Sequence, residues 1–191
     1  MASAIIDIQC ILGSNFKYLM KEMSILDVNN RGSQHYIFKH NQAPCTAKSK
    51  AVNMWLYHNY HQLSLDCGDV EYSQIERILK SLHFKCIYVK GAEKRKIIQD
   101  FIPEVNVVDL GVDHDCPRLN QLDRLYMSSN DDNYDGETNN NNNNSINCNI
   151  NYSRGRVENY DLGSPCCIYH MDLDRTQCTY HRVFSLHRWL I

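Results

Sequence analysis

Two cysteines and a histidine near the end of the chain form the pattern that most constrains its fold. Cys167 and His170 are separated by two residues, and Cys178 follows after seven more. Two thiolates and an imidazole at these spacings suit a tetrahedral zinc ion. The alternative is that both cysteines are small buried side chains and that His170 caps a helix. The pattern favours the zinc site.

Three ligands leave one position on the zinc ion to fill, and the sequence offers two candidates. His181 lies three residues after Cys178, so on a helix both side chains would face the same ion. Glu22 is distant along the chain, and only the fold would bring it close. Cys166 is a substitute ligand that would shift the register by one residue. These residues alone leave the fourth ligand open.

The cysteine content fits metal binding in a reducing compartment better than a disulfide framework. The chain has nine cysteines, an odd number, and a charged Asp7 interrupts the apolar start that a signal peptide would need. No stretch approaches the roughly 18 apolar residues of a membrane span. We therefore expect an intracellular protein of the cytoplasm or nucleus that has no membrane partner.

Charge gives little general attraction to nucleic acid. Lys and Arg number 20 against 22 Asp and Glu, which leaves a net charge of -2. The dense basic group consists of Lys85, Lys90, Lys94, Arg95 and Lys96. Such a group is either a solvated helix face or a contact for RNA phosphates, and for RNA binding the candidates are the last four of these residues.

The first 40 residues predict three antiparallel strands. Apolar, β-branched residues fill 4–12, alternating residues follow at 18–28, and the turn sequence of 29–32 leads into a third strand at 34–39. Asp7 and Gln9 are two residues apart, so their side chains lie on one face of the first strand.

Helices and strands alternate in the next part of the chain. Apolar periodicity predicts a helix over 72–82, a strand over 85–90, a helix over 93–101 and a strand over 105–110, with a closing helix over 178–190. This order predicts an α/β fold with a mixed sheet flanked by helices, and 191 residues suffice for a single domain, 1–191.

Two stretches do not follow this alternation. Residues 128–153 are rich in Asn and poor in large apolar side chains, which predicts a disordered insertion within the domain. Residues 40–70 are less regular and carry a group of rings between positions 55 and 61. Packing of these rings on the sheet and stacking on bases are the two interpretations. The rings are those of Trp55, Tyr57, His58, Tyr60 and His61.

The predicted element order resembles the RNase H-like fold of DnaQ-type exonucleases. In that family the first strand carries Asp-x-Glu, and the matching residues here are Asp7 and Gln9. An amide has no negative charge, so half of the first metal clamp is missing. Asp109 matches a later family aspartate. The resemblance therefore implies degenerate remnants of a catalytic set at Asp7, Gln9 and Asp109.

The chain also resembles the Maelstrom domain of the animal piRNA pathway, an exonuclease-type fold with a Glu-Cys-His-Cys zinc site. The spacing of Cys167, His170 and Cys178 matches the last three ligands, and Glu22 on the second strand matches the first. The resemblance implies these four zinc ligands rather than His181, in a closed structural site. The chain further resembles related stand-alone proteins of arthropods, their viruses and mobile elements.

Three functions are compatible with this resemblance. The first is a catalytically degenerate domain that binds single-stranded RNA or silencing-pathway proteins. The second is a single-stranded RNA nuclease in which acidic residues still recruit a divalent ion, namely Asp7, Glu71, Glu93 and Asp109. The third is a viral or mobile-element protein that contacts host proteins or forms part of a particle.

Overall fold

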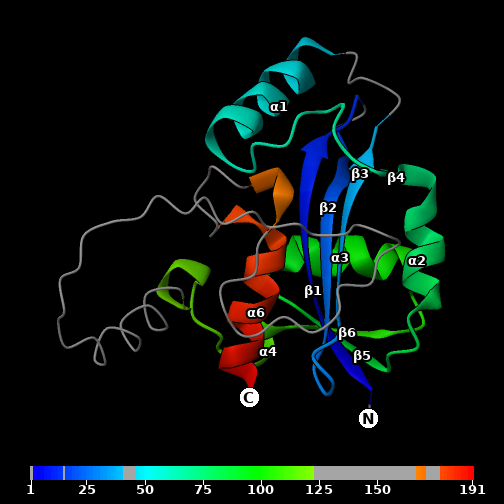
Figure 1. The fold of residues 1–191 in the computed structure, drawn as a ribbon, viewed down its shortest axis with the longest axis vertical. Coiled ribbons are helices and arrows are strands. Elements are labelled where there is room, and N and C mark those ends of the chain that lie inside the picture. Colours follow the sequence, from blue (N-terminus) through cyan, green and yellow to red (C-terminus); the bar gives the residue numbers. More distant parts are fainter. Residues whose placement is uncertain (1, 15, 41–45, 123–166, 171–176) are drawn as a thin grey trace, which may run out of the picture.

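The structure, a computed structural model, describes residues 2–14, 16–40, 46–122, 167–170 and 177–191. It is an α/β fold in which helices flank a six-stranded mixed sheet of strand order β4-β3-β2-β1-β5-β6 (Figure 1). The strands are β1 (Ser3–Leu12), β2 (Tyr18–Asp27), β3 (Ser33–Lys39), β4 (Val70–Glu71), β5 (Cys86–Val89) and β6 (Asn106–Asp109).

Strand β1 lies inside the sheet and separates its antiparallel and parallel parts. It pairs antiparallel with β2, which pairs antiparallel with β3, as the alternating apolar pattern and the turn at 29–32 predict. On its other side β1 pairs parallel with β5, and β5 pairs parallel with β6. Each parallel connection contains a helix, as such crossovers require. The prediction of a mixed α/β sheet is confirmed.

The main helices are α1 (Ala47–Asn59), α2 (Ile75–Ser81), α3 (Ala92–Phe101), α4 (Leu110–Asp113) and α6 (Thr179–Leu190). The helix expected over 72–82 begins as a 3-10 turn at Tyr72–Gln74 and continues as α2. The closing helix is α6. None of the helices in the described part of the chain is long and apolar enough to cross a membrane.

Helix α1 is the element that the sequence pattern misses. Its buried residues are Ser49 and Asn53, so it lacks the apolar stripe by which an amphipathic helix is recognised. The interpretation that the rings of residues 55–61 pack on the sheet is wrong for most of them. Trp55, Tyr57 and Tyr60 are 57%, 40% and 36% exposed, and His58 is exposed as well, whereas His61 is buried.

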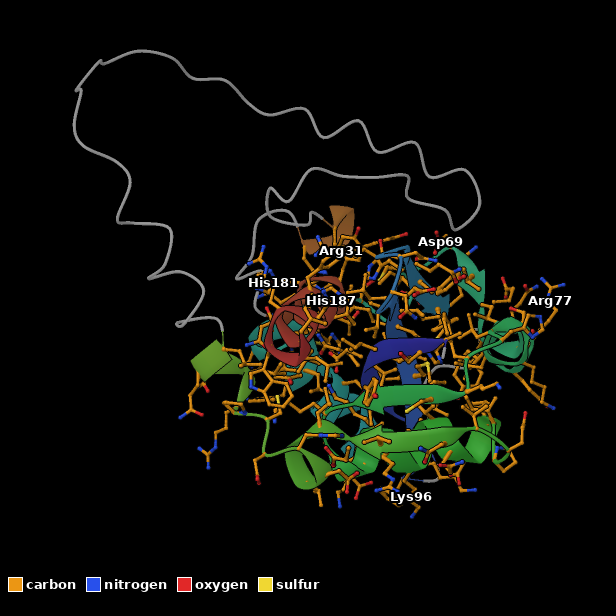
Figure 2. The ribbon with its side chains drawn as sticks, turned by 90° about the horizontal axis from the view of Figure 1, so that it is seen from below. Arg31, Asp69, Arg77, Lys96, His181 and His187 are labelled. Carbon is orange, nitrogen blue, oxygen red and sulfur yellow. The ribbon has the colours of Figure 1, made fainter. Side chains whose placement is uncertain are left out.

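One face of the sheet is covered by α2 and α3 and is almost wholly apolar. Side chains of alternate strand positions form this core with helix residues. The group includes Ala4, Ile6, Ile8, Met23, Ile25 and Phe38 from the strands and Ile75, Leu79 and Ile98 from the helices. Figure 2 shows Arg77 of α2 on the opposite side of the molecule from His181 and His187 of α6.

The face beneath α6 is apolar at one end and polar at the other. Ile5 and Leu26 pack against Val183 and Leu186 of α6. Further along the strands the same face carries buried polar side chains, those of Asp7, Gln9, Glu22, Ser24, Ser33 and His35. Buried polar groups require partners, so this end of the face is where a site is expected. The predicted insertion at 128–153 and Cys166 lie outside the described residues.

Candidate metal centre

Glu22 supplies a fully buried carboxylate from the middle of the sheet. It lies on β2 next to Lys21, and strand alternation directs the two side chains to opposite faces. The Lys21 ammonium donates to the carbonyls of Phe38, Leu65 and Cys67 at 3.0, 2.9 and 2.6 Å. The two neighbouring charges are therefore held separately, and Glu22 faces α6.

His35 approaches the same point from β3. Its Nδ1 lies 2.7 Å from the Ser24 hydroxyl, which lies 2.7 Å from the hydroxyl of Thr179. Its Nε2 lies 3.1 Å from Cys167 Sγ and 3.7 Å from Glu22 Oε1. The chain of hydroxyl groups thus orients the imidazole toward the sulfur and the carboxylate.

The remaining groups come from the two segments before α6. Cys167 and His170 belong to a 3-10 turn that includes Ile168–His170, and their Sγ and Nδ1 atoms are 3.4 Å apart. His170 Nε2 lies 2.8 Å from the carbonyl of His61, which makes it the donor and leaves Nδ1 directed at the cluster. Cys178 is the N-cap residue of α6.

Four of these side chains form a buried cluster that could hold a metal ion. One ligand atom each from Glu22, His35, Cys167 and Cys178 all lie within 4.8 Å of one another. Cys178 Sγ is 3.4 Å from Glu22 Oε1, and His170 Nδ1 is 3.8 Å from the same oxygen. His170 therefore borders the cluster as a second imidazole.

The donor set fits a cation because one of its oxygen atoms has no partner in the part of the protein that the structure describes. Glu22 Oε2 is buried and has no hydrogen-bond partner among the described residues. A buried carboxylate oxygen without a partner is costly, and a cation would satisfy it. Burial raises the pKa of the Cys178 thiol well above its usual value, which favours the neutral thiol over the thiolate unless a cation is bound. Burial opposes charge on His170, yet its hydrogen bond with Cys178 and the charge of Glu22 prevail and raise the pKa of His170 to about 9.

The structure brings together Glu22, Cys167 and Cys178, with His170 beside them, and adds His35, which the sequence analysis missed. The signal that could have found His35 is strand alternation. His35 pairs with Ser24, which is two residues from Glu22 on β2, so all three side chains lie on one face of the sheet. His181, the alternative fourth ligand, is half-buried in the first turns of α6 and is not in the cluster. A one-turn helical spacing from Cys178 does not bring it to the other sulfur.

Asp7 lies in the same buried layer but is neutralised by the protein itself. Lys94 of α3 forms an ion pair with its Oδ1, and Arg182 of α6 lies 3.8 Å from Oδ2. Arg182 also donates to Gln177 Oε1 at 2.7 Å, and Gln9 donates its amide to the Gln177 carbonyl. Two cations therefore balance the charge of the carboxylate, although its Oδ2 is buried and has no hydrogen-bond partner among the described residues.

The other acidic candidates do not join Asp7. Asp109 accepts from the backbone N–H groups of Gly91 and Gly111, both at 2.9 Å, and so ties the start of α3 to the start of α4. Glu71 and Glu93 are exposed. Among the described residues, neither they nor Asp109 form a metal-ligand group with Asp7.

The predicted basic group is mostly engaged within the protein. Lys90 donates to the carbonyl of Cys116 at 2.6 Å, Lys94 pairs with Asp7, and Arg95 lies 3.6 Å from Asp113. Lys96 is exposed at the edge of the molecule that is distant from His181 of α6 (Figure 2). These residues do not form a continuous surface of unpaired positive charge.

No protein-family model matches this chain, and a comparison with curated proteins finds no match either.

Proposed function

We propose that this chain is a catalytically silent, zinc-stabilised binding domain of the RNase H-like, Maelstrom-domain class, and that its partner is RNA. The observation that carries the proposal is the buried group of Glu22, Cys167 and Cys178 with its two imidazoles, directly beside an Asp7 that is already neutralised. Such a domain differs from an active exonuclease in two ways. A metal ion would bind at the cysteine group, and at Asp7 a cation of the protein itself takes the place of a metal ion.

The distances support zinc. Ligand atoms about 2.0 to 2.3 Å from a tetrahedral zinc ion lie roughly 3.3 to 3.8 Å from one another. Glu22 Oε1 is 3.4 Å from Cys178 Sγ and 3.8 Å from His170 Nδ1, and that nitrogen is 3.4 Å from Cys167 Sγ. Two thiolates and an imidazole also favour zinc over the oxygen-seeking ions calcium and magnesium.

We assign the four zinc ligands to Glu22, Cys167, His170 and Cys178, with His35 outside the first sphere. His170 donates its Nε2–H to a backbone carbonyl, the usual support of a metal-bound imidazole. His35 can accept from Ser24 at Nδ1 and donate from Nε2 to the Cys167 sulfur. Zinc bound in this way would supply a cross-link between β2 and the start of α6.

The neutralised Asp7 supports a role without metal-dependent cleavage. Exonucleases of the resembled class hold two divalent ions between several carboxylates. Here the neighbouring strand position is Gln9, Lys94 pairs with the carboxylate, and Asp109 is used as a helix cap. A protein with this arrangement can keep the sheet as a scaffold and use its surface for binding.

The zinc assignment is tested by metal analysis of the purified chain. We expect about one zinc per wild-type chain and a marked loss in Cys178→Ser, while Cys86→Ser, on β5 and outside the cluster, keeps the ion. Circular dichroism of each variant separates metal loss from general unfolding. Zinc retained in Cys178→Ser at the wild-type ratio would contradict the site.

The catalytic part of the proposal is tested separately. Labelled single-stranded RNA incubated with the zinc-loaded protein and added magnesium or manganese should remain intact. Cleavage of the RNA by the wild-type protein that is lost in Asp7→Asn would contradict the proposal and would support the nuclease hypothesis instead.

A further inference from the structure

The buried residues of helix α1 are the polar Ser49 and Asn53. Asn53 is buried and bonds both backbone groups of Leu12, accepting from its N–H at 2.8 Å and donating to its carbonyl at 2.9 Å. Ser49, also buried, donates to the carbonyl of Thr46, the N-cap residue, whose side chain accepts from Ser49 N–H. Polar anchoring at the end of β1 leaves the outer face of α1 available for other side chains.

The outer face of α1 carries large apolar and aromatic side chains. Lys50, Met54 and Tyr57 follow one another at helical spacing, and Trp55 and His58 form a second stripe beside them. Met54 is 59% exposed and Trp55 57%. A stripe of this kind at the surface of a folded protein marks an interaction site. Figure 1 shows α1 at one end of the molecule, away from both termini.

The exposed rings continue onto the turn between β1 and β2. Phe16 and Tyr18 are 56% and 57% exposed. The Lys48 ammonium lies over the Phe16 ring, 5.1 Å from its centre, and joins the turn to α1. Phe16 has a φ of 60°, which is unusual for a bulky residue and presents a strained turn at this point.

The charge of α1 favours an anionic partner. The helix contains Lys48, Lys50 and no Asp or Glu, although the whole chain has a net charge of -2. Exposed aromatic rings interleaved with cations are complementary to a chain of unpaired bases joined by phosphates. An apolar protein partner would explain the rings but not the exclusion of acidic residues.

We propose that the outer face of α1, with the turn at Phe16, binds single-stranded RNA. Bases stack on Trp55 and Tyr57, and Lys48 and Lys50 contact phosphates. The inference rests on the proposed function only for the choice of RNA as the nucleic acid. It places the contact on α1 and not on the basic group around Lys96.

The test is fluorescence anisotropy of a labelled 15-nucleotide oligouridine at two salt concentrations. Trp55→Ala combined with Tyr57→Ala should weaken binding at least about 25-fold, because each of the two base–ring stacks lost costs a factor of about five or more. Lys48→Gln with Lys50→Gln should lower the salt slope by about 1.4, at roughly 0.7 per phosphate contact. Lys96→Gln and Val112→Ala, both exposed and outside this surface, are the matched controls.

Each outcome decides one part. Wild-type affinity in the Trp55/Tyr57 double variant, or loss of affinity only in Lys96→Gln, would overturn the surface while leaving zinc and RNA binding in place. Equal affinity for oligothymidine would overturn the choice of RNA. Self-association that the double variant abolishes, without RNA binding, would identify a second copy of the chain as the occupant and overturn the inference. The zinc content of every variant is measured in parallel, so a failure of the metal site is recognised separately.

Discussion

Gln9 lies directly opposite Glu22 in the antiparallel pairing of β1 with β2. Both side chains are buried beneath α6, Gln9 at 3% exposure and Glu22 at 0%. Side chains at opposed positions of neighbouring strands are close enough to interact strongly. A neutral amide at Gln9 therefore places no second carboxylate beside Glu22, which remains the only acidic partner of the two cysteines among the described cluster residues.

Gln9→Glu should not restore a nuclease centre. The substitution recreates the Asp-x-Glu pattern, but it buries a charge beside Glu22 and removes the amide donor to the Gln177 carbonyl. We expect a loss of about 1–3 kcal/mol in the free energy of unfolding, measured by urea titration. Gln9→Met, which removes the donor without adding charge, is the control. Metal-dependent RNA cleavage gained by Gln9→Glu would contradict the account of Asp7.

The two imidazoles should differ in their effect on zinc. His170→Ala removes an assigned ligand, so stoichiometric zinc should be lost or its affinity reduced by more than about a hundredfold. His35→Ala removes a hydrogen-bond donor to Cys167 and should keep one zinc with affinity reduced about 10- to 100-fold. Competition with a chromogenic chelator measures both. If His35→Ala lost the zinc ion and His170→Ala kept it, His35 would be the ligand and His170 its neighbour.

Asp7 and Lys94 should be energetically coupled. Lys94→Met leaves a fully buried carboxylate with Arg182 as its remaining cation, and about 2–4 kcal/mol of stability should be lost. Asp7→Asn combined with Lys94→Met should cost less than the sum of the single changes, because the charge and its partner are removed together. A double-mutant cycle by urea unfolding gives the coupling. Additive effects would show that the pair does not interact.

Acid should destabilise the fold through His40. Burial, and then the nearby charge of Lys21, lower the pKa of this half-buried imidazole from 6.5 to about 4. Between these values the unfolded chain binds more protons than the folded one, so stability is lost as the pH falls from about 6.5 to 4. The slope from one such group is at most about 1.4 kcal/mol per pH unit.

His61 adds to this effect, since burial also lowers its pKa to about 4. Urea unfolding at several pH values measures the combined slope. His40→Gln should reduce it, and an unchanged slope in that variant would show that His40 does not contribute.

Several parts of the fold could be predicted because their signals are local. A β-branched apolar run marked β1, alternation marked β2, and the turn sequence of 29–32 marked the start of β3. Periodicity of 3.6 residues marked α2, α3 and α6. Helix α1 could not be found in this way, because Ser49 and Asn53 form its buried face and its rings point outward. When the buried residues of a helix are polar, the sequence pattern does not show which side of the helix packs against the rest of the protein.

The residues of the candidate site also divide into those that the sequence indicated and those that it did not. The spacing of Cys167, His170 and Cys178 indicated a metal centre because all three lie within twelve residues. His35 gave no such signal, since it reaches Cys167 only through the pairing of β2 with β3 and the hydroxyl of Ser24. In the same way Lys94 and Arg182 reach Asp7 from two different helices.

By itself the sequence determined the kinds of element and the ligands that a short segment can supply, because both depend on interactions between near neighbours in the chain. The tertiary structure decided which face of each strand is covered by α6, which cations neutralise Asp7 and which side of α1 meets solvent. Those outcomes depend on the packing of residues that are far apart in the chain, such as Glu22 and Cys178, and the energies that fix them exist only once the sheet and helices have assembled.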